Sequence, residues 1–186
     1  MKKIITLLLL FVALSVQAQE EHMKFMGIPL DGKISQFQMK LSAKGVTPDD
    51  GIIDYKSLGS RRYKGSFAGK NATIFIYFDE NTKVVYRAKA VITSYSEELN
   101  ESEYNYFFNM LSKKYGDYAD IKKDEHDNYE SSIFLIYNKL TAEYKYLGNI
   151  DVYRSKSSYN NEYYLHIDYN DTINVVMHEN NSMDDL

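Results

Sequence analysis

Two adjoining stretches, ATIFIYF at Ala72–Phe78 and VVYRAKAVIT at Val84–Thr93, decide the fold. The first is almost wholly apolar and aromatic, which predicts a central strand of a sheet. The second alternates in polarity, with Arg87 and Lys89 on the face that also holds Val85 and with the other face formed by Val84, Tyr86, Ala88, Ala90 and Ile92. The connecting Asp79-Glu80-Asn81-Thr82 has turn-forming composition, so the two stretches predict an antiparallel hairpin.

Amphipathic helices are predicted on either side of this hairpin. Between Lys33 and Lys44 the apolar residues recur at i, i+3 and i+7, and Gly45 follows. The segment 96–115 carries a longer apolar stripe and ends at Gly116. The charged segment 117–130 reads as a loop, and further strands are expected at 62–68, 141–147, 150–155, 162–169 and 173–178.

The order of these elements indicates the fold class. Because helices do not alternate singly with strands, the chain is expected to be α+β with antiparallel meanders. We expect two helices packed on one face of a curved, mostly antiparallel sheet. The segments 25–95 and 96–178 both run from a helix into a meander. This shared layout suggests two similar halves, although no residue-level repeat accompanies it.

The N-terminus has the features of a secretory signal peptide over residues 1–18. Lys2 and Lys3 precede an apolar run, and Ala18 before Gln19 fits the cleavage rule. The run is about a dozen residues, short of the roughly 20 that a membrane-spanning helix needs. We therefore expect an exported chain, periplasmic or secreted, with no integral membrane segment. With no Cys in the sequence, a lipid anchor is also not expected.

Length and composition limit the remaining possibilities. Residues 19–178 suit a single domain, and residues 179–186 read as a flexible acidic tail. A net charge of −4 argues against a nucleic-acid partner and against anionic membrane surfaces. The lack of Cys excludes thiol catalysis, zinc–thiolate sites and redox chemistry.

The histidines offer only a weak metal site. His166 and Asp168 are spaced i, i+2 and would project from one face of a strand, and His178 would lie on a neighbouring strand. Neither a His-x-His nor an HExxH spacing supports this reading, and His166 is more simply a surface residue of a tyrosine-rich strand. We expect no bound metal and no cofactor.

No residue stands out as catalytic. The segment Lys64–Gly69 does not match G-x-S-x-G, and no phosphate-binding glycine loop is present. The tyrosines, 18 in number, are the more informative feature, because exposed Tyr on a sheet can contact a sugar or a protein. The best candidates for contact residues are Tyr153, Tyr163 and Tyr164, although aromatic pairs that only stabilise the sheet would look the same.

Several short segments together resemble a family of small secreted proteins of gut Bacteroidetes. These are FMGIPLDG at 25–32, GSFAG at 65–69, KKYG at 113–116 and YNDTIN at 169–174. The resemblance implies an α+β fold similar to the β-lactamase-inhibitor-protein type and carries over no catalytic residue. The triplet Asp171-Thr172-Ile173 also resembles the O-glycosylation acceptor motif of exported Bacteroidetes proteins, with Thr172 as the acceptor.

The sequence therefore favours a non-enzymatic exported binding module. Its partner would be a protein or a glycan, bound through an exposed tyrosine-rich sheet face. Two alternatives remain open: a hydrolase that uses carboxylates or His166 with Asp168, and an inhibitory or structural protein that grips another protein with a concave sheet.

Overall fold

The computed structural model describes residues 21–49, 59–126, 129–138 and 145–183. The expected signal peptide at 1–18 and its cleavage site at Ala18 and Gln19 lie outside the described residues, as does the end of the acidic tail. Within the described ranges, no helix is long and apolar enough to cross a membrane.

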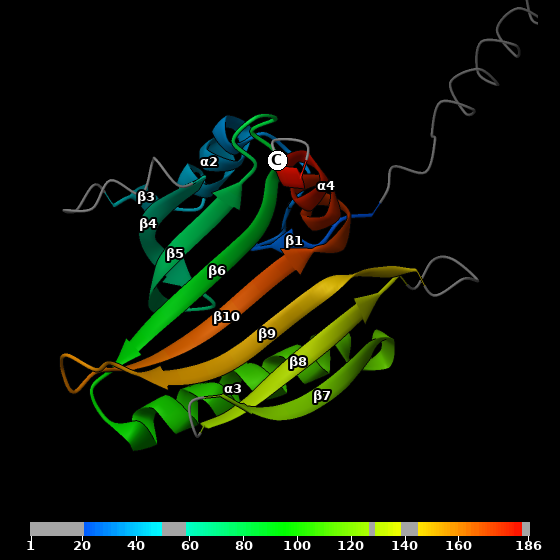
Figure 1. The fold of residues 1–186 in the computed structure, drawn as a ribbon. Helices are drawn as coiled ribbons and strands as arrows, with labels where there is room; N and C mark the ends of the chain where they lie inside the picture. The colour runs from blue at the N-terminus through cyan, green and yellow to red at the C-terminus, as the bar shows by residue number, and fades with distance from the viewer. Residues whose placement is uncertain (1–20, 50–58, 127–128, 139–144, 184–186) are drawn as a thin grey trace, which may run out of the picture.

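The fold is α+β and is built on one large antiparallel sheet (Figure 1). Its eight strands lie in the order β3-β4-β5-β6-β10-β9-β8-β7, and β1 and β2 form a separate two-stranded hairpin. The bounds are β1 Lys24–Phe25, β2 Ile28–Pro29, β3 Thr47–Pro48, β4 Ser60–Phe67, β5 Lys70–Phe78, β6 Val85–Ser94, β7 Ala119–His126, β8 Tyr129–Tyr137, β9 Tyr146–Lys156 and β10 Tyr163–Asp171.

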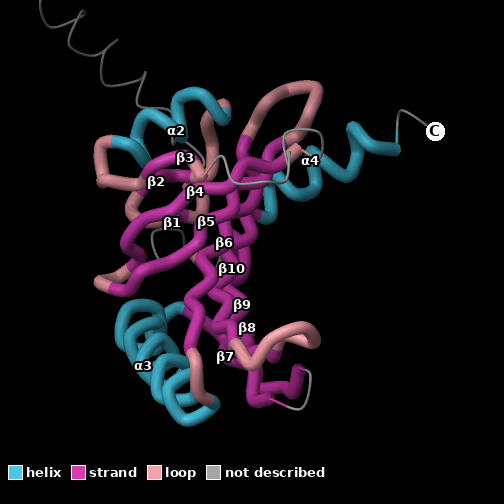
Figure 2. The backbone as a smooth tube through the Cα atoms, turned by 90° about the vertical axis from the view of Figure 1, so that its left-hand side faces the viewer, coloured by secondary structure: helices cyan, strands magenta, loops and turns pink. Residues whose placement is uncertain are grey.

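Three α-helices accompany the sheet in the described residues: α2 Ile34–Ser42, α3 Glu97–Tyr115 and α4 Thr172–Met183, with a 3-10 turn η2 at Gly116–Tyr118. Figure 2 shows α2 and α3 on one side of the sheet and α4 on the other. The expectation of two helices on one face is therefore correct for α2 and α3 but incomplete. The strand expected at 173–178 is wrong, because these residues belong to α4, and the helix continues through residues 179–183 of the expected tail.

Tertiary contacts explain why α4 is a helix despite its β-branched sequence. Asp171 is fully buried and accepts a hydrogen bond from the backbone N–H of Asn174 at 3.0 Å, which caps the first turn. The same carboxylate accepts a hydrogen bond from the backbone N–H of Met23 at 2.8 Å. The Asn174 side chain donates to the carbonyl oxygens of Leu30 and Val85. These partners are remote in sequence, so local propensity could not indicate them.

The hydrophobic core lies between the sheet and the helices α2 and α3. An aromatic cluster occupies its centre: the rings of Phe25 and Phe67 stack at 5.2 Å, and Phe67 stacks on Phe107 of α3 at 5.8 Å. Tyr169 of β10 meets Phe25 edge to face at 5.3 Å. Buried aromatic pairs of this kind add to the free energy that area burial alone supplies.

The β5–β6 hairpin forms as the sequence predicts, with one change in register. A β-bulge shifts the pairing so that Phe78 lies opposite Val85 whereas Tyr77 lies opposite Arg87. Val85 is consequently buried in the core together with Ala88, although the simple alternation placed it beside Arg87. An extra residue in one strand is not visible in the polarity pattern.

The segment 117–130, expected to be a loop, instead supplies the edge strand β7 and the start of β8. Every β7 residue from Asp120 to His126 is exposed, which is why its composition resembles a loop. Strand β10 lies between β6 and β9 and pairs antiparallel with both. It therefore joins the two halves of the sheet.

Candidate functional site

The face of the sheet opposite α2 and α3 carries an unusual set of polar side chains, which we call the open face. Of the described elements, only α4 lies on this side, where it packs against β6, β9 and β10 (Figure 2). Strand alternation places on the remainder of the face a central group from four neighbouring strands: Tyr77, Arg87, Lys89, Asp151, Tyr153, His166 and Asp168.

An ion pair lies at the centre of the open face. Arg87 binds Asp168 in bidentate fashion: its Nε donates to Oδ1 at 2.8 Å and its Nη2 donates to Oδ2. Asp168 is only 2% exposed, and the guanidinium also lies over the ring of Tyr77, 4.8 Å from its centroid. The hydrogen bonds to Asp168 raise the pKa of Arg87 above its ordinary value. The pair is thus desolvated and held in one geometry.

An aromatic stack adjoins this ion pair. The rings of Tyr153 and His166 are nearly parallel, with an interplanar angle of 8° and centroids 4.4 Å apart. On the other flank of Tyr153, the ring of His126 lies 4.7 Å away and tilted by 41°. Because β10 and β7 lie on opposite sides of β9, the two histidines approach the tyrosine ring from opposite sides. The Tyr153 ring is therefore held in place by a parallel stack on His166 and a tilted contact with His126.

Burial fixes the protonation states within the stack. The pKa of His166 falls from 6.5 to about 3, first because burial disfavours the imidazolium and then because of the positive charges of Lys89 and His126. His166 is therefore neutral at physiological pH. Its Nε2 lies 2.9 Å from the Ser155 hydroxyl, and its buried Nδ1 has no hydrogen-bond partner among the described residues. Burial also raises the pKa of Tyr153 to about 12, so its hydroxyl remains protonated.

Burial also shifts the pKa values of two further charged groups on this face. Burial lowers the pKa of Lys89, whose ammonium lies 5.5 Å from the ring centroid of Phe75. Burial raises the pKa of Asp151, which pairs across the strands with Asp168 and accepts a hydrogen bond from Asn149 at 2.6 Å. Half-buried charges of both signs lie side by side here, an arrangement that favours a charged and complementary ligand surface.

The structure separates the three tyrosines chosen from the sequence. Tyr153 and Tyr164 lie on the open face, on either side of His166, and the Tyr164 hydroxyl donates to Glu162 at 2.8 Å. Tyr163 points to the opposite face of the sheet, where Lys156 lies 5.0 Å from its ring centroid. Two of the three candidates therefore share a surface.

The structure does not bring the metal candidates together. His166 and Asp168 do share the open face, but His178 lies on α4 rather than on a neighbouring strand. There His178 Nδ1 lies 2.9 Å from Asp79 Oδ2, and its ring stacks on Tyr86 at 4.3 Å. Asp168 is occupied by Arg87. Within the described residues, no three His, Cys, Asp or Glu side chains are grouped as metal ligands.

The acceptor-like triplet lies at the start of α4. Asp171, its first residue, is fully buried and binds the backbone of Met23 and Asn174 and the His22 ring at 3.1 Å. Thr172 is half-buried and contacts the Tyr146 hydroxyl. The Asp of the motif thus holds the N-terminal segment and caps a helix in this structure.

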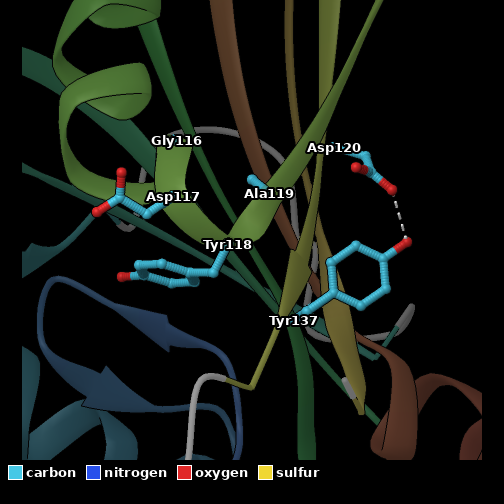
Figure 3. A pocket seen from close by; sticks show the side chains of 6 residues that line it. All are labelled: Gly116, Asp117, Tyr118, Ala119, Asp120 and Tyr137. Carbon is cyan, nitrogen blue, oxygen red and sulfur yellow. Dashed lines mark hydrogen bonds between the residues drawn. The ribbon is translucent and has the colours of Figure 1, made fainter. Parts of the chain in front are cut away.

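A hollow of about 460 Å³ opens where α3 passes into β7, at one end of the sheet (Figure 3). It is lined by Gly116, Asp117, Tyr118, Ala119, Asp120 and Tyr137. Figure 3 shows Asp117 and Asp120 pointing to different sides, with Asp120 turned toward Tyr137, which donates a hydrogen bond to it at 3.2 Å. The two carboxylates therefore do not converge as the acid and base of a hydrolase would.

Sequence reasoning missed most of the open-face group. The alternation of Arg87 and Lys89 did indicate a polar strand face, but Asp151 and Tyr77 carried no signal of their own. The missing information was strand order, since only the adjacency of β6, β10 and β9 brings Arg87, Asp168 and Asp151 together. Comparison of the chain with protein-family models, curated proteins and solved structures finds no match in any of the three.

Proposed function

We propose that this chain is an exported, non-enzymatic binding module that grips a protein partner with its open face. The observation that carries the proposal is the half-buried group around the Arg87–Asp168 pair on a sheet face that no described element covers apart from α4. Export rests on the signal-peptide pattern of residues 1–18, and the resemblance to small secreted Bacteroidetes proteins agrees with it.

The chemistry of the face favours a protein over a glycan. Tyr, Arg and His side chains that are already ordered bind with little entropic cost, and Tyr and Arg are the residues enriched at the centres of protein interfaces. A sugar would need a free aromatic ring face, and the Tyr153 ring is stacked on His166 and contacts His126. The charges of Lys89 and Asp151 would instead select a partner of complementary charge.

An inhibitory role is the nearest alternative, because it would use the same face. A binding module and an inhibitor differ in what the partner does, not in the geometry of the contact. The hydrolase alternative gains no support from the hollow beside β7, whose carboxylates point to different sides.

The test is a steric block placed on the open face. Thr93 is exposed on β6 and lies opposite Tyr164, so Thr93→Arg adds bulk there without disturbing the core. The control is Ser102→Arg, which also replaces a small hydroxyl residue by arginine, at an exposed position of α3. Partners captured from the extracytoplasmic fraction are identified with the wild-type chain, and their affinities are then measured for both variants.

We expect Thr93→Arg to weaken binding of the captured partner by at least about tenfold, because the arginine obstructs the seating of a partner on the open face. Ser102→Arg should bind like the wild type, and both variants should keep the wild-type circular dichroism spectrum. Equal binding by both variants, or a loss only with Ser102→Arg, would mean that the open face is not the contact surface.

A further inference from the structure

A second surface of the molecule has the chemistry that the open face lacks for binding carbohydrate. Two hollows adjoin at the end of the sheet where η2, β7 and β8 meet the N-terminal hairpin: one of about 460 Å³ and one of about 310 Å³. Tyr118 and Tyr137 line both of them. The hollows are therefore neighbouring parts of one groove, which we call the tyrosine groove.

We propose that the tyrosine groove is a binding site for a short neutral oligosaccharide, with one sugar unit in each hollow. The proposal is independent of the open face, because the groove lies at the β7–β8 side of the sheet and shares no lining residue with the central group around Arg87. Each hollow falls within the range of roughly 300–1,000 Å³ that is usual for small-molecule sites.

The aromatic lining supplies the surface on which a sugar ring would rest. Tyr118 is braced by Tyr115, with ring centroids 5.7 Å apart and an interplanar angle of 73°. Tyr137 is braced in the same way by Tyr146, at 5.7 Å and 55°. Braced aromatic rings lose little conformational entropy when a ligand binds. Figure 3 shows the Tyr118 and Tyr137 rings projecting from the two sides of the strand that separates them.

The polar lining suits hydroxyl groups, which both donate and accept hydrogen bonds. Asp117 and Asp120 offer acceptors in the larger hollow, and the Tyr137 hydroxyl orients the Asp120 carboxylate from 3.2 Å. In the smaller hollow, Lys24 and Lys114 offer donors. Groups of both signs line the groove, so an uncharged polyol matches it better than a cation or an anion.

The experiment titrates the purified full chain with cellobiose, maltose and chitobiose, using isothermal calorimetry and saturation-transfer NMR. We expect at least one disaccharide to bind with a Kd of about 1 mM or tighter, as a small site of this kind allows. Tyr118→Leu, which keeps an apolar side chain at the position, should weaken binding of that disaccharide by at least about tenfold, because the sugar stacks on the aromatic ring. Asp120→Asn, which keeps the size of the side chain, should also weaken it.

Two controls separate the groove from the rest of the molecule. Tyr159→Ala removes a tyrosine that is 98% exposed in the β9–β10 turn, and it should leave sugar binding unchanged. Thr93→Arg, the open-face block, should also bind sugar like the wild type. The proposal is overturned if no disaccharide binds at about 10 mM, where a 1 mM site would be nearly saturated. Binding that survives both groove variants, or binding of spermidine in place of the sugars, would overturn it equally.

Discussion

The two faces of strand β6 show how one stretch of sequence serves two purposes. Ala88, Ala90 and Ile92 point toward the core and are buried, and their small or compact side chains leave room for the aromatic cluster beneath α2 and α3. Arg87 and Lys89, which alternate with them, point to the open face and remain half-buried beside Asp168. The first face gains stability from apolar burial, whereas the second holds charged groups whose desolvation costs stability unless every partner is in place.

The largest expected effect is a loss of stability, which should differ between the two faces when one phenylalanine is removed from each. Phe107 of α3 is fully buried against Phe67, so Phe107→Ala should lower the free energy of unfolding by about 3–5 kcal/mol. Phe75 is half-buried on the open face beneath Lys89, so Phe75→Ala should cost only about 1–2 kcal/mol. Urea denaturation of both variants measures the difference. Equal losses would show that the open face contributes to the core as strongly as the helix-covered face does.

The next effect tests whether the open face depends on its ion pair. Arg87→Met leaves the nearly fully buried Asp168 without its bidentate partner, and we expect a loss of about 2–4 kcal/mol, at the lower end because the arginine side chain is 35% exposed. Asp168→Asn in the Arg87→Met background should recover part of the loss, since it removes the uncompensated charge. Chemical denaturation of the single and double variants forms a double-mutant cycle. Additive losses would contradict direct coupling between the two residues.

The third effect, small for each pH unit, is a dependence of stability on pH that arises from His166. Its folded-state pKa of about 3 lies below its ordinary value of 6.5, so between these values the unfolded chain binds a proton that the folded chain does not. Stability from this residue is therefore complete above pH 6.5 and declines as the pH falls toward 3, by up to about 1.4 kcal/mol per pH unit. Denaturation curves between pH 4 and pH 7 measure the slope.

The His166→Gln variant is the control for this slope. Glutamine keeps a polar side chain beside Ser155 but does not titrate. The unfolding free energy of the variant should therefore change less steeply with pH than that of the wild type, by the equivalent of up to one bound proton. Identical slopes in the wild type and the variant would mean that the pKa of His166 is the same in the folded and the unfolded chain, so that burial does not disfavour its imidazolium.

The sequence predicted the β5–β6 hairpin, α2 and α3 because each has a local pattern that its tertiary surroundings reinforce. It did not predict α4, because Thr172–Val176 favours a strand until the buried Asp171 caps it and Asn174 binds the backbone of Leu30. It placed Val85 on the wrong face because a bulge interrupts the alternation. The open-face group depends on strand order, and the groove depends on where η2 ends, and neither can be read from periodicity.

The position of β10 has a consequence for how the protein is made. Of the described strands, β10 is the last in the sequence, so β6 and β9 each keep an unpaired backbone edge until residues 163–171 have been synthesised. A nascent chain of this design cannot close its sheet until β10 has been added between β6 and β9. Chains that end before Tyr163 would lack β10, so the β3–β6 and β7–β9 parts of the sheet would stay unjoined. Such chains would be substrates for quality-control proteases.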